Sequence, residues 1–196
     1  MSLDPITITG GIGVPFIMSS LLVAKEANTR ASKTETEMAD LVDTKDKLID
    51  EEIVKVAKAV TIRARKPDEG LSAEEYDSFM LATEARTNLR DLKELVSIIR
   101  DRTTKSYIYC FASAFSLLAT TLIYTFRQQN QYFLPFSYMA SVVCILIGYY
   151  YIRDGIYMFV PIRKLERAIA SLKIVRSVEK LNEETIMILD ELRAIF

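Results

Sequence analysis

The amino-acid sequence predicts an all-α integral membrane protein, in which a hairpin of two transmembrane helices is joined to a cytoplasmic, antiparallel, coiled-coil-like stalk. Two long segments, 106–126 and 128–152, contain no Asp, Glu, Lys or Arg. Each is long enough to cross a bilayer, because a helix rises about 1.5 Å per residue and the hydrocarbon core is roughly 30 Å thick. Elsewhere, charges of both signs alternate with apolar residues at spacings of three and four, which is typical of amphipathic helices.

The placement of tyrosine supports the two spans. All but one of the ten tyrosines lie between Tyr107 and Tyr157, and most of these are near the ends of the two apolar segments. Tyrosine prefers the headgroup level of a membrane, where its ring is half dry and its hydroxyl is wet. The sequence therefore predicts one aromatic belt at each interface.

A third uncharged segment, Pro5–Ala24, is expected to be an additional N-terminal span. Asp4 stands where a secretory signal would carry basic residues, so we expect the segment to remain in the mature chain. Gly10, Gly11 and Pro15 disfavour a regular helix but are tolerated in membranes. An interfacial or re-entrant segment is the alternative.

Basic residues predict the orientation of the hairpin. The link between the spans, 127–134, carries only Arg127, whereas several Lys and Arg residues flank the hairpin on its other side. Because basic residues stay cytoplasmic, we expect 25–105 and 153–196 to lie inside and the link to lie outside, most simply in the cell membrane.

The first segment that we expect to be cytoplasmic, 25–105, is predicted to form two helices. Ser32 with Glu35, and Thr34 with Glu37, each fit a capping box and predict a helix start. The expected apolar stripe of this helix comprises Leu41, Val42, Leu48, Ile49, Ile53, Val56 and Val60. After the breakers Pro67 and Gly70, a capping box of Ser72 and Glu75 starts a second helix. Its expected stripe comprises Ala82, Ala85, Leu89, Leu92, Val96, Ile99 and Thr103. Nothing interrupts this second helix before Ser106, so we expect it to continue into the membrane.

Beyond the second span, Asp154, Gly155 and Pro161 predict a bend at the interface. A single third amphipathic helix is then expected, with the stripe Leu165, Ile169, Leu172, Val175, Leu181, Ile188, Leu192 and Ile195. The predicted organisation is a membrane segment at 1–24, a helical hairpin at 25–105, a transmembrane hairpin at 106–152, and the bend with its helix at 153–196.

Catalytic and cofactor chemistry finds little support. The chain has no histidine, which excludes His-based catalysis and His metal ligands. Its two cysteines, Cys110 and Cys144, lie at different depths of the two predicted spans, and we interpret both as packing residues. The sequence GGIGVP lacks the Gly-Lys-Ser/Thr ending of a phosphate loop. The acidic stripe Asp40, Asp43, Asp46 and Asp50 could bind a divalent ion or be a solvated face, and a solvated face is favoured because no ligand loop accompanies the stripe. We expect no enzyme activity, cofactor, metal or catalytic residue.

Small residues recur four apart in both spans. They are Ala112, Ser116 and Thr120 in the first, and Ala140, Cys144 and Gly148 in the second. Small faces let membrane helices approach closely. These six residues are the predicted helix-packing interface.

The layout of the chain is similar to those of two known families. A coiled coil leading into a two-helix hairpin, followed by an amphipathic helix, resembles the pore subunit of the mitochondrial calcium uniporter. That family has acidic residues at the start of its second span, where this chain has NQYFLPFSYM. One span, a cytoplasmic hairpin and two further spans also resemble the membrane insertases of the Oxa1/YidC superfamily. These have a hydrophilic groove, commonly with a basic residue in the membrane, whereas the spans here hold no Lys or Arg.

The function predicted from the sequence is that of a non-catalytic accessory subunit of an integral membrane complex. Its partners would be other membrane subunits or further copies of the chain, and the bilayer. Nucleic acid is not expected, since acidic and basic residues are nearly balanced in 25–105. The alternatives are an insertase-like chaperone and a channel-like oligomer without an acidic selectivity site.

Overall fold

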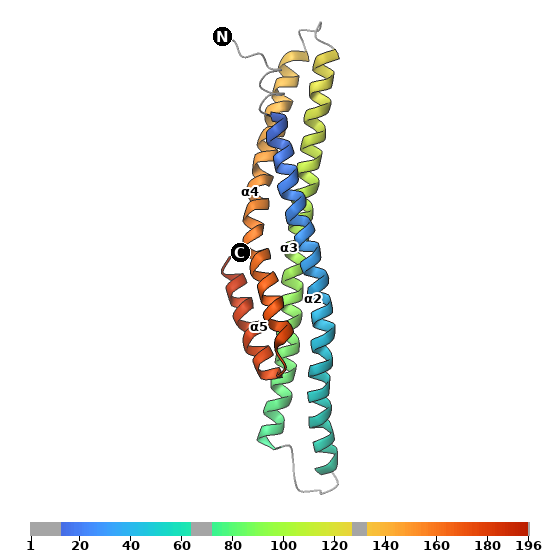
Figure 1. Cartoon of the computed structure of the whole chain (residues 1–196), viewed down its shortest axis with the longest axis vertical. Coiled ribbons are helices and arrows are strands. Elements are labelled where there is room, and N and C mark those ends of the chain that lie inside the picture. Colours follow the sequence, from blue (N-terminus) through green and yellow to red (C-terminus); the bar gives the residue numbers. More distant parts are fainter. Residues whose placement is uncertain (1–12, 64–71, 127–132, 196) are drawn as a thin grey trace. The chain divides into compact units, whose positions relative to one another are not determined.

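The computed structural model describes residues 13–63, 72–126 and 133–195, and all regular structure within them is helical (Figure 1). The helices are α2 (Val14–Arg63), α3 (Ala73–Phe126), α4 (Phe133–Ile174) and α5 (Val178–Arg193). The predicted all-α class is therefore confirmed. The chain divides into two compact units. Unit 1 comprises Met1–Ser32 and Ile99–Ile162, and unit 2 comprises Lys33–Ile98 and Arg163–Phe196.

Helix α2 is continuous through the position where the sequence predicted a helix start. The capping boxes at Ser32 and Thr34 are therefore wrong, because both residues lie in the interior of one helix. The physical reason is an unbroken buried stripe of mostly small residues, which keeps one face of α2 packed on both sides of Ser32. The stripe contains Ile17, Ser20, Ala24, Ala27, Ala31, Thr34 and Met38.

Helix α3 begins where its capping box predicted. The amide of Ser72 donates to Glu75 Oε2 at 3.1 Å, and the amide of Glu75 donates to Ser72 Oγ at 3.3 Å. All seven residues of its predicted stripe, from Ala82 to Thr103, are buried. The helix continues through Ser106 to Phe126 without a break, as the sequence predicted.

Helix α4 contains the residues that were expected to bend the chain. The predicted bend is wrong: Asp154, Gly155 and Pro161 all lie within the helix. Gly155 permits a close approach to α2, since a Cβ atom there would lie 3.7 Å from Val23 Cγ1 and 3.9 Å from Ala24 Cα. Packing, rather than a turn, accounts for this glycine.

The predicted single third amphipathic helix is also wrong. Helix α4 ends at Ile174, Ser177 has extended backbone, and α5 begins at Val178. Helix α5 folds back along the end of α4 (Figure 1), and Lys164 Nζ lies 3.2 Å from Glu191 Oε2. Unit 2 is therefore built from four helical segments. Its most deeply buried large side chains are Met38, Ile49, Leu89, Leu92, Leu165, Ile169, Leu172 and Leu181.

Several predicted features lie outside the described residues. They are the turn at Pro67 and Gly70, most of the link 127–134, and the first part of the N-terminal block.

Candidate functional site

One stretch in the described part of the chain, Val142–Ile174, is long and apolar enough to cross a membrane by length and composition. Only 22% of its most apolar window is buried within the structure. Most of this apolar surface is therefore not buried by other parts of the chain.

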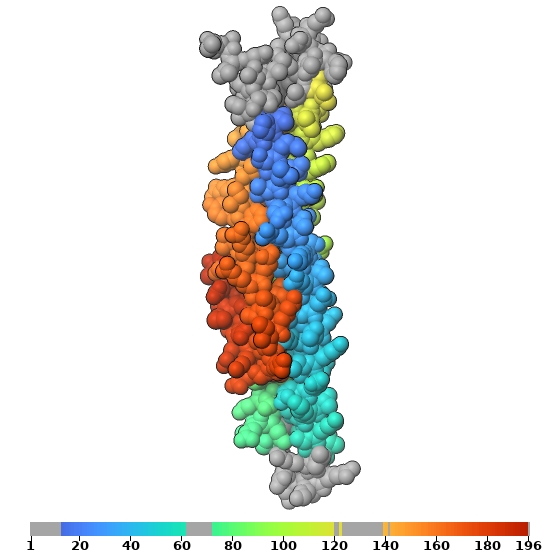
Figure 2. All heavy atoms as spheres, in the orientation of Figure 1, coloured from blue at the N-terminus to red at the C-terminus, as the bar shows by residue number. Residues whose placement is uncertain are grey.

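The interior of unit 1 contains small and hydroxyl-bearing residues beside a few large apolar ones such as Ile17 and Leu117. Ser113 Oγ donates to the backbone carbonyl of Cys144 at 2.6 Å, linking α3 to α4. A Cβ atom added to Gly148 would lie 3.4 Å from Ile17 Cγ1 and 3.7 Å from Ser113 Oγ. In this unit the atoms of α2 and α4 lie directly against one another (Figure 2). The small side chains allow this close approach.

The exterior of unit 1 carries the large apolar side chains. On α3 the exposed residues recur at spacings of three and four, and on α4 a similar set is exposed. We call these two sets the outer apolar face. Its residues are Ile108, Phe111, Phe115, Leu118 and Leu122 on α3, and Met139, Val142, Val143, Leu146, Ile147, Tyr149 and Tyr150 on α4. A monomer in water rarely exposes so many large apolar side chains together, so this face requires a bilayer or a partner.

The six predicted packing residues divide between interior and exterior. Cys144 and Gly148 are buried inside unit 1, and Ala140 is half-buried. Ala112 and Ser116 are exposed, while the side chain of Thr120 lies outside the description. On α3 the residues that pack within the chain are instead Cys110, Ser113, Ala114 and Leu117. The use of Ala112 and Ser116 by a partner stays a prediction.

Three polar contacts lie close together along the helices of unit 1 and link α2, α3 and α4. We call them the polar girdle. Arg102 donates to both carboxylate oxygens of Asp154, at 2.7 and 3.4 Å. Thr104 Oγ1 donates to Asn28 Oδ1 at 2.9 Å, and Ser106 Oγ donates to the carbonyl of Tyr151 at 3.1 Å. Sequence reasoning missed the girdle, because its members are far apart in the chain and form no motif.

Unit 2 holds a buried lysine at the corner between α4 and α5. Lys45 is only 5% exposed, and its ammonium group donates to the carbonyls of Lys173 and Val175. Burial lowers the pKa of Lys45, and the nearby charge of Glu184 opposes this shift. The sequence offered one signal: Lys45 follows Met38 and precedes Ile49 in the buried stripe of α2.

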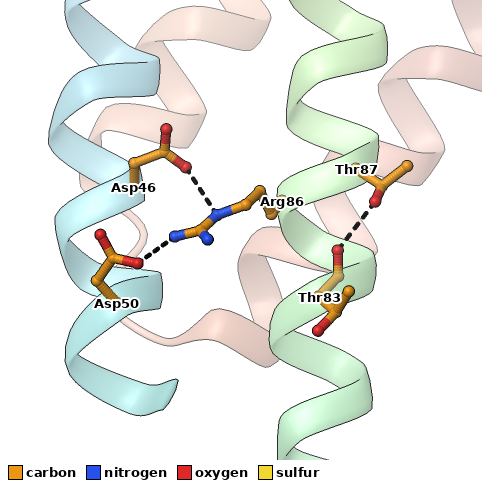
Figure 3. A network of polar contacts seen from close by, with 5 residues as sticks. All are labelled: Asp46, Asp50, Thr83, Arg86 and Thr87. Atoms are coloured by element: carbon orange, nitrogen blue, oxygen red, sulfur yellow. Dashed lines mark hydrogen bonds and ion pairs between the residues drawn. The ribbon is translucent and has the colours of Figure 1, made fainter. Parts of the chain in front are cut away.

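Two further polar contacts hold the helices of unit 2 in register. Asn88 Nδ2 on α3 donates to Asn182 Oδ1 on α5 at 2.8 Å. Arg86 on α3 donates to Asp46 and Asp50 of α2 (Figure 3), and these contacts, with that to Asp50 first, raise the pKa of Arg86. Half of the predicted acidic stripe is thus engaged by a guanidinium. Among the described residues no group of three or more His, Cys, Asp or Glu side chains is arranged to hold a metal ion.

Comparison of the chain with protein-family models, with curated proteins and with solved structures gives no match.

Proposed function

We propose that this chain is a non-catalytic accessory subunit of an integral membrane complex. In this proposal the apolar parts of α3 and α4 cross the bilayer as a hairpin, accompanied by the N-terminal part of α2. Unit 2 is the cytoplasmic bundle that a partner contacts.

The observation that carries the proposal is the distribution of residue sizes in unit 1. Its interior holds Ser20, Ala24, Ser113 and Gly148 beside a few large side chains such as Ile17 and Leu117, whereas its exterior holds many large apolar side chains. Phe111, Phe115, Leu118 and Leu146 are examples. A soluble bundle buries its largest apolar side chains, since their burial is the main driving force for folding. Membrane helices associate instead through small residues and interhelical hydrogen bonds, with large apolar side chains toward lipid.

Unit 2 has the opposite distribution, and this supports a cytoplasmic location. Large side chains such as Leu89, Leu165 and Leu172 form its core, and its surface carries charges of both signs. Ion pairs tie its helices together at the surface, as in Arg86 with Asp46 and Lys173 with Glu37. A bundle of this kind offers a stable surface for a partner in water.

Two hydrogen bonds favour an accessory role over an insertase-like role. An insertase-like chaperone would present hydroxyl groups of its spans to a client segment. Ser113 and Ser106, however, direct their hydroxyl groups to carbonyls inside unit 1. The outer apolar face then remains as the surface for other membrane helices.

The test is photo-crosslinking in the native membrane, with two positions of α3, two residues apart, that face opposite ways. A photoreactive residue at Phe115, which is 67% exposed, should capture another membrane subunit or a second copy of the chain. The same residue at Leu117, which is 1% exposed, should give only crosslinks within the chain. A chain that runs as a lone monomer in mild detergent and gives no crosslink from Phe115 would contradict the proposal.

A further inference from the structure

The charged residues in the described part of unit 1 lie in three short segments. In the described residues they are Lys25, Glu26 and Arg30 on α2, Arg100, Asp101, Arg102 and Lys105 on α3, and Arg153 and Asp154 on α4. We call this set the charged end of unit 1. On α3 and α4 it adjoins the outer apolar face, and on all three helices the described residues of unit 1 that follow on the apolar side carry no charge.

This end carries a surplus of positive charge. Six of its residues are basic and three are acidic, which leaves 6 − 3 = 3 positive charges. Each acidic residue already has a cation at ion-pair distance: Glu26 has Arg30, Asp101 has Lys105, and Asp154 has Arg102. Two further cations, Lys25 and Arg153, have no carboxylate at ion-pair distance among the described residues, and they are complementary to an anion.

Arg153 is the cation best placed to meet that anion. It is exposed, it lies 5.5 Å from the centroid of the Tyr157 ring, and no carboxylate pairs with it among the described residues. It also continues the outer apolar face of α4, following Leu146 and Tyr150 at spacings of four and three. Arg153 lies seven positions after Leu146, which is a rise of about 10 Å along a helix.

We propose that the charged end of unit 1, with Arg153 as its main ligand, binds the phosphate headgroups of anionic phospholipids. This inference rests on the proposed membrane location. A lipid with its acyl chains along Leu146 and Val143 would bring its phosphate to the level of Arg153, where a guanidinium can donate two hydrogen bonds to phosphate oxygens. The exposed rings of Tyr150 and Tyr157 suit the same headgroup level.

The experiment measures lipid retention by the full chain. The chain is purified in mild detergent and incubated with equal amounts of phosphatidylglycerol and phosphatidylcholine. Native mass spectrometry then measures the mass of the chain with its bound lipid. We expect the wild type to retain phosphatidylglycerol preferentially. The double variant Arg153→Gln/Lys25→Gln should lose that preference on the order of thirtyfold, from the typical contribution of two cations near an anionic surface.

A matched variant controls for loss of charge alone. Arg167→Gln/Lys180→Gln removes one Arg and one Lys from exposed positions in unit 2, and it should retain phosphatidylglycerol as the wild type does. Far-UV circular dichroism of all variants checks that the helices are intact.

Three results would overturn the inference: equal retention of the two lipids by the wild type, equal loss in the two double variants, or release of a protein partner by Arg153→Gln/Lys25→Gln while lipid retention is unchanged. The last would show that the anion is an acidic protein segment. Extraction with alkaline carbonate distinguishes failure of the proposed function from failure of this inference. If the proposed membrane location is wrong, alkaline carbonate will release the chain from membranes.

Discussion

The ammonium group of Lys45 donates hydrogen bonds to the backbone carbonyls of Lys173 and Val175, at the point where α4 ends. The last carbonyls of a helix have no partner within the helix and carry its negative dipole end. A buried cation from α2 satisfies them and fixes the corner that sends α5 back along α4. The nearby Glu184 Oε2 is buried and without a hydrogen-bond partner, and its charge favours the protonated lysine.

Replacing Lys45 should therefore loosen the corner of unit 2. We expect Lys45→Ala to lower the free energy of unfolding by about 1–3 kcal/mol, because buried carbonyls lose their donor. The exposed neighbour Lys47 is the control, and Lys47→Ala should change stability by less than about 0.5 kcal/mol. Chemical denaturation followed by circular dichroism measures both, and equal stability of the two variants would refute the capping role.

The lowered pKa of Lys45 also predicts a dependence of stability on pH. Between its folded-state pKa and the ordinary value of 10.5, the unfolded chain holds a proton that the folded chain has released. Stability rises with pH wherever the unfolded state binds more protons. The wild type should thus gain stability relative to Lys45→Ala as the pH is raised through this window toward 10.5. A parallel pH dependence for both proteins would show that the folded-state pKa is not lowered.

The Arg86 contacts predict a measurable coupling between α2 and α3. Because Arg86 is 27% exposed and meets two carboxylates, we expect a double-mutant cycle of Arg86→Gln with Asp46→Asn/Asp50→Asn to give a coupling of about 1 kcal/mol. The coupling should shrink in high salt. The exposed pair Lys55 and Glu52, within α2, should give a smaller value, and a larger coupling there would contradict the assignment.

The difference between the interior and exterior of unit 1 predicts opposite responses to leucine. At Gly148 a large side chain must displace Ile17 and Ser113, so Gly148→Leu should cost about 1–3 kcal/mol or more, while Gly148→Ala should be tolerated. At the exposed Ala112, Ala112→Leu should leave the stability of the isolated chain unchanged but weaken association with a partner. The temperature of unfolding measures the effect on stability, and the yield of crosslinked product measures the effect on association. A loss of stability at Ala112 equal to that at Gly148 would contradict the assignment of faces.

Continuity of α3 through the polar girdle predicts sensitivity to proline. Thr104→Pro should cost about 3 kcal/mol or more, because it removes an amide donor, clashes with the preceding turn and deletes the hydrogen bond to Asn28. Ala73→Pro is the matched change at the first position of the same helix, where proline is tolerated. Denaturant midpoints that shift equally for both variants would argue against one continuous helix.

Local sequence signals predicted some helix ends and failed at others for physical reasons. The capping box of Ser72 and Glu75 follows Pro67 and Gly70, which both disfavour a helix that continues from the preceding residues. The pair Ser32 and Glu35 follows no breaker, and the buried stripe of α2 passes through it without a change of phase. A capping sequence alone does not stop a helix whose packed face continues on both sides.

The turn between α4 and α5 was missed because it contains neither glycine nor proline. The available signal was the interval of six positions from Val175 to Leu181, which breaks the spacing of three and four. Lys45 was missed because it lies next to an acidic stripe, where lysines are usually solvated. Contacts such as Ser113 with Cys144 depend on which helices become neighbours, and a single sequence does not specify that.

The central claim, that unit 1 crosses a membrane and unit 2 lies in the cytoplasm, is tested most directly by cysteine labelling in intact cells. In a background without Cys110 and Cys144, single cysteines replace Gln129, in the link, or Glu183, on α5. An impermeant maleimide should label the Gln129→Cys chain in intact cells, and should label the Glu183→Cys chain only after permeabilisation. Labelling of both in intact cells, or of Glu183→Cys alone, would contradict the claim.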